Sequence, residues 1–317
     1  MKRRTMIALI VAAALIITGG IILVLGLSFA GDNTQKSKLI RQEITIQESF
    51  DNITIDTEDC DVKFAMFSGR DDCMVEVHSY KNVKHTAAVE NGTLKIQMVD
   101  ERNWTDHINI GWTESMRMTV YLPAAEYESL HARTTTGDIT LGQEPMFLEA
   151  QLRTSTGDIS CVTGVAGDLL DCMTSTGDIS VQNSTSKILK LQSNTGDFTV
   201  SVVAGDEIHM RTNTGEVDAE NVNVLMFTCQ TETGDVELEQ VLTDDYLQIR
   251  TDTGDVGIES SDADMVNIET NTGDVHGHFL TPKRISAFSE TGDVNVPITL
   301  EGGECRIKSN TGDIRIR

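Results

Sequence analysis

The 317-residue chain has few basic residues, few aromatic residues and few prolines. Lysine and arginine number 25 against 49 aspartates and glutamates, so the formal net charge is −24. Phosphate binding needs clustered lysine and arginine, and this deficit argues against a nucleic-acid-binding protein. Aromatic residues make up only 5% of the chain, with four prolines and 25 glycines. That composition argues against a globular enzyme with one thick core and favours thin layers joined by tight turns.

Charge is also missing from residues 6–30, which follow the basic residues Lys2, Arg3 and Arg4. A helix over these residues would be roughly 38 Å long, enough to cross a hydrocarbon core of ~30 Å with tilt. The basic cluster predicts a cytoplasmic N-terminus (1–5), and everything after the segment is then outside the cytoplasm. The sequence therefore predicts a single-pass protein of the cell membrane.

A cleaved signal peptide is the alternative for this segment, because Ser28 and Ala30 are small residues suitably placed before a cut. Secretory signals usually have apolar cores of about 7–15 residues, which favours an uncleaved anchor. Residues 31–43 are polar and are expected to form a tether. In both cases the body of the chain is exported.

A Thr-Gly-Asp or Thr-Gly-Glu motif recurs ten times from residue 130 onward, at intervals of 19 or 20 residues. A fixed period of this length is typical of a solenoid, in which each unit buries its apolar face against its neighbours. The ten glycines are Gly137, Gly157, Gly177, Gly196, Gly215, Gly234, Gly254, Gly273, Gly292 and Gly312.

Apolar residues alternate with polar ones on both sides of each motif, and Ile, Val or Phe lies two positions after every glycine. A period of two indicates strands and excludes helical repeats. We expect each unit to contain a strand, a corner at the motif, a second strand and a connection of roughly eight residues. Stacked units predict an all-β fold, a parallel β-solenoid of about ten rungs spaced ~4.8 Å apart over residues 130–317.

Each residue of the Thr-Gly-Asp corner has an expected role in the turn. Glycine accepts a positive φ cheaply, which a corner repeated in every rung requires. The threonine directly before the glycine, and the Thr or Ser two residues further back, share the phase of the inward apolar positions. Their hydroxyls are expected to form a column of hydrogen bonds along the rod. The acidic residue after the glycine is out of phase and should face solvent.

Residues 44–129 contain less regular strands, which we expect to form irregular coils that cap the N-terminal end of the rod. The segment 99–115 carries Trp104 and Trp112 and fits no rung. The predicted strands are 44–47, 52–57, 62–66, 74–77, 94–98 and 116–122.

Three features resemble the bacterial putative-adhesin family, also called toastrack domains, which includes LiaG-like cell-envelope proteins. They are FDNITIDTEDCDVKF (50–64), VYLP (120–123) and the run of T-G-D-I/V motifs, and the resemblance covers roughly residues 44–317. The resemblance implies a right-handed β-solenoid, often tethered to a membrane and encoded near envelope-stress systems. It carries no catalytic residues. Cys60 departs from the family, which has a small apolar residue there.

The acidic column is the main candidate site, because like charges about 5 Å apart repel one another by roughly 1 kcal/mol per neighbour in water. We expect each carboxylate to cap its own turn, and Arg133, Arg153, Arg211, Arg250 and Lys308 to share the charge. A weak Ca²⁺ column is the alternative, although each rung offers only one carboxylate. The column comprises Asp138, Asp158, Asp178, Asp197, Asp235, Asp255, Asp274, Asp293 and Asp313.

No nucleophile–base pair or metal-spaced cluster is apparent, so we expect neither an enzyme nor a cofactor. His131 and His209 share a column but lie four rungs apart, too far to bind one ion. His276 and His278 flank Gly277 and are a weak hint of a metal site.

The six cysteines keep the inward phase of their strands, which favours buried thiols. Cys172 and Cys229 share a column three rungs apart, about 14 Å, beyond disulfide reach. Pairing of Cys161 with Cys172, or of Cys60 with Cys73, stays open. The final rung (308–317) ends in Ile-Arg-Ile-Arg, and its edge is expected to be open for a partner's strand.

We therefore expect a non-catalytic, membrane-anchored extracytoplasmic β-solenoid that binds or senses at the cell envelope. Its partner would be an envelope protein or a cell-wall polymer. The alternatives are a carbohydrate-active β-helix enzyme, which needs a cleft with paired carboxylates, and a structural spacer, whose function would survive charge reversal of the aspartate face.

Overall fold

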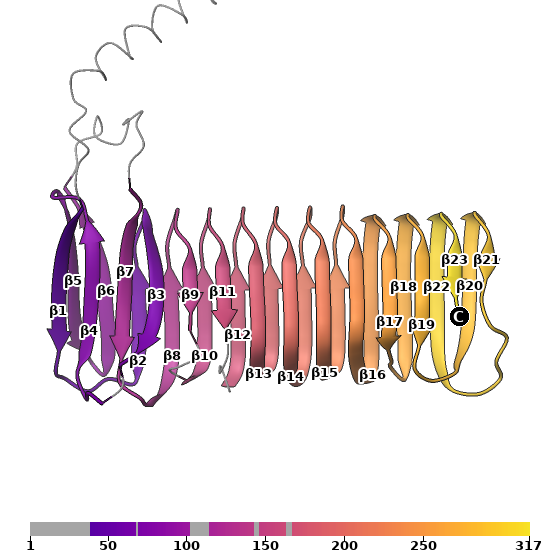
Figure 1. Cartoon of the computed structure of the whole chain (residues 1–317), viewed down its shortest axis with the longest axis horizontal. Helices are drawn as coiled ribbons and strands as arrows, with labels where there is room; N and C mark the ends of the chain where they lie inside the picture. Colours follow the sequence, from indigo (N-terminus) through magenta and orange to yellow (C-terminus); the bar gives the residue numbers. More distant parts are fainter. Residues whose placement is uncertain (1–38, 68, 102–113, 143–145, 163–166) are drawn as a thin grey trace, which may run out of the picture.

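The computed structural model is a rod of stacked β-strands (Figure 1). It describes residues 39–67, 69–101, 114–142, 146–162 and 167–317, and within these ranges it contains strands and no helix. None of the described residues therefore belongs to a helix that could cross a membrane. The predicted anchor at 6–30 and the segment holding Trp104 and Trp112 lie outside the described residues.

Each Thr-Gly-Asp motif is a corner between two sheets, as the alternating pattern predicts. We call the sheet that enters the corners the leading sheet and the sheet that leaves them the trailing sheet. One corner and its two strand segments make a rung. The middle strands pair in parallel with the strands of the next rung. They are β8 (Glu126–Arg133), β9 (Ile139–Leu141), β10 (Met146–Arg153), β11 (Ile159–Val162), β12 (Gly167–Met173), β13 (Ile179–Gln192), β14 (Phe198–Arg211), β15 (Val217–Gln230), β16 (Val236–Thr253), β17 (Val256–Ser261), β18 (Met265–Thr272) and β19 (Val275–Phe279).

The expected eight-residue connections are wrong for β13 to β16, because these strands run from the trailing sheet into the next rung of the leading sheet. One residue with a positive φ makes the bend. These residues share a column, and their φ angles lie between 49° and 55° at Asn183, Val202, Asn221, Gln240 and Ser260. A single left-handed residue changes the strand direction without ending the pairing.

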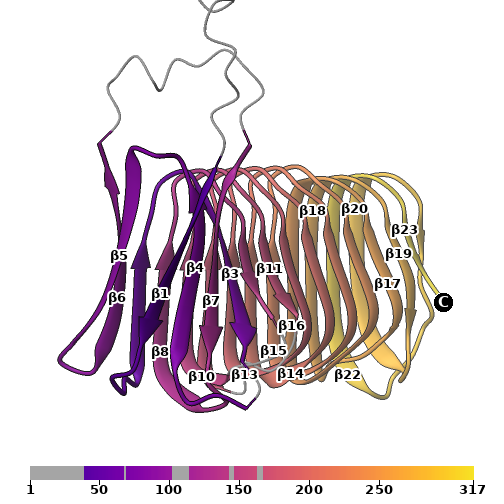
Figure 2. The ribbon, with the colours of Figure 1, turned by 60° about the vertical axis from the view of Figure 1, so that its left-hand side comes forward.

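The N-terminal end combines parallel rungs with an antiparallel cover. β2 (Asn52–Asp56) and β3 (Cys60–Met66) pair with the first Thr-Gly-Asp rung on one side and with β6 (Thr93–Asp100) and β7 (Met116–Leu122) on the other. Three further strands pair antiparallel and close this end (Figure 2). They are β1 (Ile40–Ile46), β4 (Cys73–Ser79) and β5 (Val83–Glu90), of which β5 was not predicted.

At the other end the last two rungs are stacked out of sequence order. β18 and β19 pair with β22 (Gly303–Thr311) and β23 (Ile314–Ile316), and these in turn pair with β20 (Lys283–Thr291) and β21 (Val294–Asn295). The predicted open edge at 308–317 is therefore wrong, because this rung has a neighbour on both sides. β20 and β21 end the rod (Figure 1).

The solenoid has about nine turns, slightly fewer than the ten rungs predicted. Its core is the column of inward apolar residues between the sheets, in which Phe64, Phe147, Phe198 and Phe227 are fully buried. Burial of one such side chain contributes roughly 1.5–3 kcal/mol. The predicted inward phase of the six cysteines is confirmed, since all are buried and unpaired by disulfides.

Candidate functional site

The aspartates after the glycines lie in one column along the corners. All of these carboxylates except that of Asp293 accept a hydrogen bond from the backbone N–H of the acidic residue in the next rung of the stack, as between Asp158 and Asp178 at 2.8 Å. The expectation that each carboxylate caps its own turn is therefore wrong. Such bonds, 2.7–3.1 Å long, link Asp61 to Asp138 and continue through Asp158, Asp178, Asp197 and Glu216, then from Asp235 through Asp255, Asp274 and Asp313 to Asp293.

The expected sharing of charge with nearby arginines is also wrong for two of them. Arg153 pairs with Asp171, with 3.1 Å between Nη1 and Oδ1, and Arg250 lies 3.8 Å from Glu269. Both arginines face out from the leading sheet. Among the described residues, the arginine that touches the column is Arg315, which pairs with Asp313 and lies 3.8 Å from Asp274.

Only one of the two hydroxyl columns faces inward. In the rungs of Thr154 to Thr270 the Thr or Ser three residues before the glycine is buried, and its hydroxyl donates to the glycine carbonyl of the preceding rung at 3.0–3.4 Å, as from Thr154 to Gly137 and from Ser193 to Gly177. The threonine directly before the glycine is exposed, for example Thr156 and Thr214. The predicted inward position of that second column is wrong, because the backbone already turns there.

The aspartate column is therefore part of the fold, since one carboxylate oxygen of most rungs bonds to the backbone. Among the described residues, no group of three or more His, Cys, Asp or Glu side chains is arranged to hold a metal ion. His131 and His209 are four rungs apart in the strand register, as predicted.

The outer face of the leading sheet is hollowed along the rod. A hollow of about 440 Å³ lies over β12 to β16, and one of about 560 Å³ lies over β16, β18, β22 and β20. Both take lining residues from β16. Two neighbouring columns of side chains line the first hollow: Asp171, Lys190, His209, Thr228 and Gln248, and beside them Met173, Gln192, Arg211, Gln230 and Arg250. We call the two hollows together the leading-sheet groove.

Hydrogen-bond donors and positive charge dominate this groove, although the chain as a whole is acidic. The carboxylates that line it lie beside arginines: Asp171 beside Arg153, Glu269 beside Arg250, and Glu304 at 3.2 Å from Arg284. Within the described part of the chain, Lys190, Arg211 and Arg306 have no carboxylate within ion-pair distance and are available to a ligand.

His209 is oriented within the groove by two contacts. Its Nδ1 lies 2.8 Å from Thr228 Oγ1 and its Nε2 lies 3.0 Å from Glu207 Oε2. With Gln192, Gln230 and Gln248 it gives the groove hydrogen-bonding groups at the spacing of the rungs. A repeating polar ligand lying along the rod could bond to successive rungs in the same way.

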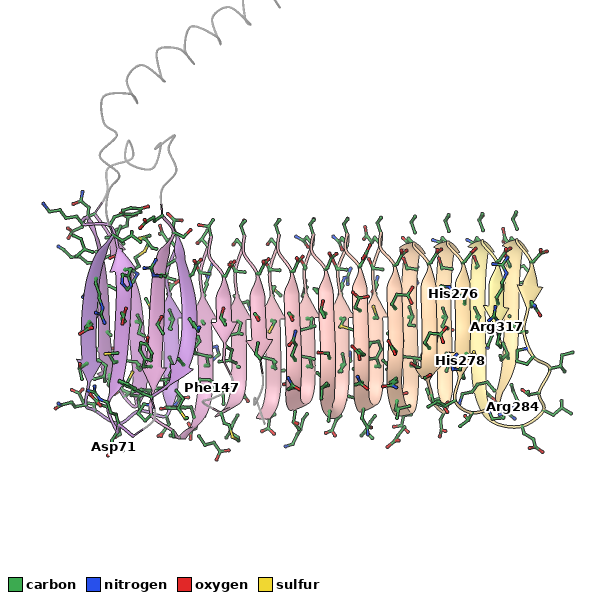
Figure 3. All side chains as sticks on the ribbon, in the orientation of Figure 1. Asp71, Phe147, His276, His278, Arg284 and Arg317 are labelled. Carbon is green, nitrogen blue, oxygen red and sulfur yellow. The ribbon has the colours of Figure 1, made fainter. Side chains whose placement is uncertain are left out.

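The trailing sheet presents the histidines that were a weak hint of a metal site. Figure 3 places His276 and His278 along β19, in the part of the rod near Arg317. His278 Nδ1 lies 2.7 Å from Glu259 Oε2, so this imidazole is in contact with a carboxylate of the neighbouring strand. His276 faces Glu237, whose carboxylate lies over Gly257; partial burial raises the pKa of Glu237, and the imidazole opposes that shift.

The sequence analysis missed the leading-sheet groove because it considered the corner motif, which is repeated in every rung. The groove residues lie at positions that differ from rung to rung. A signal was present, since the outward positions four and six residues before successive glycines hold Lys, Arg, His and Gln in the middle rungs.

The model of the family described as Toastrack DUF4097 matches residues 50–240 and 206–317. Among curated proteins no relative matches the sequence. A solved putative adhesin from Bacteroides fragilis is 13% identical with a TM-score of 0.41, and one from Parabacteroides distasonis is 12% identical with a TM-score of 0.42. Each alignment covers 88% of this chain and 97% of the other.

A third solved structure, described as a putative lipid binding protein from Parabacteroides distasonis, is 13% identical with a TM-score of 0.30. That alignment also covers 88% of this chain and 97% of the other. Because the family model spans most of the sequence, including every Thr-Gly-Asp motif, the chain belongs to the toastrack family.

Proposed function

We propose that this protein is a non-catalytic binding protein of adhesin type, which holds a glycan of the cell envelope along the leading-sheet groove. The observation that carries the proposal is the groove itself, in which amide and guanidinium groups recur along the rungs beside the imidazole of His209 and the ammonium group of Lys190. Glycans present hydroxyl and carboxylate groups at regular intervals, and such groups accept hydrogen bonds from these donors.

The net charge of −24 does not prevent binding of a ligand that carries some carboxylates. At physiological ionic strength the Debye length is about 8 Å, so carboxylates far from the groove are largely screened. Lys190 and Arg211, which lack ion pairs within the described residues, would then dominate the local field. Binding should weaken as salt is added.

The test is a titration of the full chain with polygalacturonic acid, an acidic glycan, and with dextran, a neutral one. We expect saturable binding of the acidic polymer. The double variant Lys190→Glu, Arg211→Glu should weaken it by about tenfold or more, because two favourable charge contacts become repulsive. Its matched control is Lys63→Glu, Arg117→Glu, which makes the same charge change on the outward, exposed positions of the trailing sheet.

Three results would contradict the proposal: binding of neither polymer, equal weakening by both double variants, or new reducing ends during incubation. The last would instead favour the carbohydrate-active enzyme. Substitution of Asn for Asp158 and Asp178 in the corner column should leave binding unchanged, because that column lies on the edge of the rod and bonds to the backbone.

We also propose that residues 6–30 anchor the chain in the cell membrane with its body outside the cytoplasm. The uncharged length of the segment and the basic residues before it support this orientation. Membranes from expressing cells should retain the chain after alkaline extraction, and mass spectrometry should find an intact N-terminus. A mature chain beginning at Gly31 would mean that the segment is a signal peptide.

A further inference from the structure

The C-terminal end of the rod presents an open strand edge and an apolar loop. Among the described residues β20 pairs only with β22, so its other edge has no partner. Two aliphatic side chains in the following loop are almost fully exposed, Ile298 at 96% and Leu300 at 89%, and Phe288 of β20 is 56% exposed. Figure 1 shows this loop, between β21 and β22, extending beyond the last strands. Exposed apolar patches at an open edge are typical of interaction sites.

The other end of the rod is closed in a different way. Its outermost strands β1 and β5 are antiparallel additions that carry exposed ion pairs, between Arg41 and Glu76 at 2.9 Å and between Lys84 and Glu101 at 2.9 Å. Charged side chains of this kind discourage edge pairing. A head-to-tail contact between the two ends is therefore disfavoured.

Only the leading sheet is available for pairing at the C-terminal end. In the trailing sheet β21 is two residues long, and Pro297 follows shortly after it. Proline has no N–H to donate and blocks extension of that edge. β20 is nine residues long and contains no proline.

The sequence of β20 is complementary to itself in an antiparallel register centred on Ala287. This register places Arg284 opposite Glu290 of a second copy, and Glu290 opposite the second Arg284. Both residues face outward, while Ile285 and Ala287 face inward and are half-buried. The register keeps inward residues opposite inward residues, so the apolar core would continue across the joint. Figure 3 places Arg284 at this end of the rod.

We propose that two copies of this chain join end to end by antiparallel pairing of β20 with β20 across a two-fold axis at Ala287. The contact uses the same surface of both copies, so it closes after two chains and forms no fibre. Each overhanging loop would cover Ile298 and Leu300 against the corner of the other copy. The proposal does not depend on the proposed glycan binding, because it concerns association of the protein alone.

The test is sedimentation of the full chain over a range of concentrations, with any detergent matched in density. We expect a species of twice the mass of the chain. Arg284→Glu or Glu290→Arg alone should raise the dissociation constant about tenfold, since the two-fold axis makes each change count twice. Arg284→Glu combined with Glu290→Arg should restore association. Arg306→Glu, on the enclosed strand β22, is the matched control and should have no effect.

A cross-link checks the register independently. Residues opposite each other at a two-fold axis of antiparallel strands are close enough for a disulfide, so Ala287→Cys should form a covalent dimer under oxidation. Thr199→Cys, on the exposed face of β14, should not. A monomer at every concentration, failure of the charge exchange to restore association, or equal cross-linking at both positions would each overturn the proposal.

Discussion

The middle of the rod and its C-terminal end contain the same repeated motif but bury it to different extents. Each middle rung is covered on both sides by another rung, and its inward side chains, such as Val200, Phe227 and Ile249, are almost fully buried. In the terminal rung the equivalent residues Ile285 and Ala287 are only half-buried. A solenoid therefore has uniform chemistry along its length but not uniform burial, because only interior rungs have two neighbours.

The last two rungs are stacked in the reverse of their order in the sequence. The chain passes over one rung position after Phe279 to form β20 and β21, and then returns to place β22 and β23 in the space left. The strands β22 and β23 thereby have a neighbouring rung on both sides. The terminal position is instead occupied by β20, a strand that is connected to the rest of the chain at both of its ends.

The largest expected difference in stability between regions is between glycine substitutions in a middle rung and in the N-terminal hairpin. A Cβ at Gly177 would lie 2.0 Å from the carbonyl oxygen of Gly157, at a φ of 147°. We expect Gly177→Ala to cost more than about 4 kcal/mol or to prevent folding, because the whole stack would have to separate there. Gly92→Ala, in a hairpin with a φ of 76° and no atom within 4 Å, should cost about 1 kcal/mol. Urea unfolding followed by circular dichroism measures both, and equal losses would contradict the comparison.

The next largest difference in stability is between phenylalanine substitutions in the middle of the rod and at its C-terminal end. Phe198 in the middle is fully buried, whereas Phe288 in the terminal rung is 56% exposed. Phe198→Ala should therefore cost about 3–5 kcal/mol through lost burial and the cavity it leaves. Phe288→Ala should cost less than about 0.5 kcal/mol in dilute solution. Thermal unfolding of the two variants tests this. A large loss of stability in the Phe288→Ala variant would show that Phe288 is buried against another molecule in solution.

The N-terminal end should be the acid-sensitive part of the rod. His85 of β5 is 2% exposed, both its ring nitrogens lack a hydrogen-bond partner, and burial lowers its pKa to about 4. Unfolding returns the pKa to about 6.5, so the unfolded chain binds the proton first. Stability should be full above the unfolded pKa and should fall by up to about 3 kcal/mol as the pH drops from about 6.5 to about 4.

Urea unfolding at about pH 7.5 and about pH 4.5 measures this loss against a His85→Leu variant. The variant has no proton to bind and should show a smaller decrease. An equal decrease in both proteins would assign the acid sensitivity to other groups.

The sequence predicted the repetition but not its order along the rod. Period-two alternation predicted the strands beside each motif and their parallel stacking, and together with the alternation in the N-terminal strands it predicted the burial of all six cysteines. The motif spacing did not predict the exchanged rungs, because both contain the same motif at the usual spacing. The available signal was Gly302-Gly303, where a Cβ at Gly303 would lie 2.4 Å from the carbonyl oxygen of Asp264. The groove was missed for a related reason, since its residues vary from rung to rung.

The smallest expected difference in stability, between two substitutions of opposite sign, lies within the regular middle. Val202 occupies the bend with a φ of 55° and is 52% exposed, whereas Asn183 and Asn221 hold the same position in the neighbouring rungs. A β-branched residue is strained in the left-handed region, while asparagine tolerates it. Val202→Asn should therefore stabilise the protein by about 0.5–1 kcal/mol, and Asn221→Val should destabilise it by a similar amount. Shifts of the urea midpoint in opposite directions would show that the left-handed backbone conformation at the bend determines the change in the free energy of unfolding. Loss of stability in both variants would mean that Val202 contributes through apolar contacts at the surface.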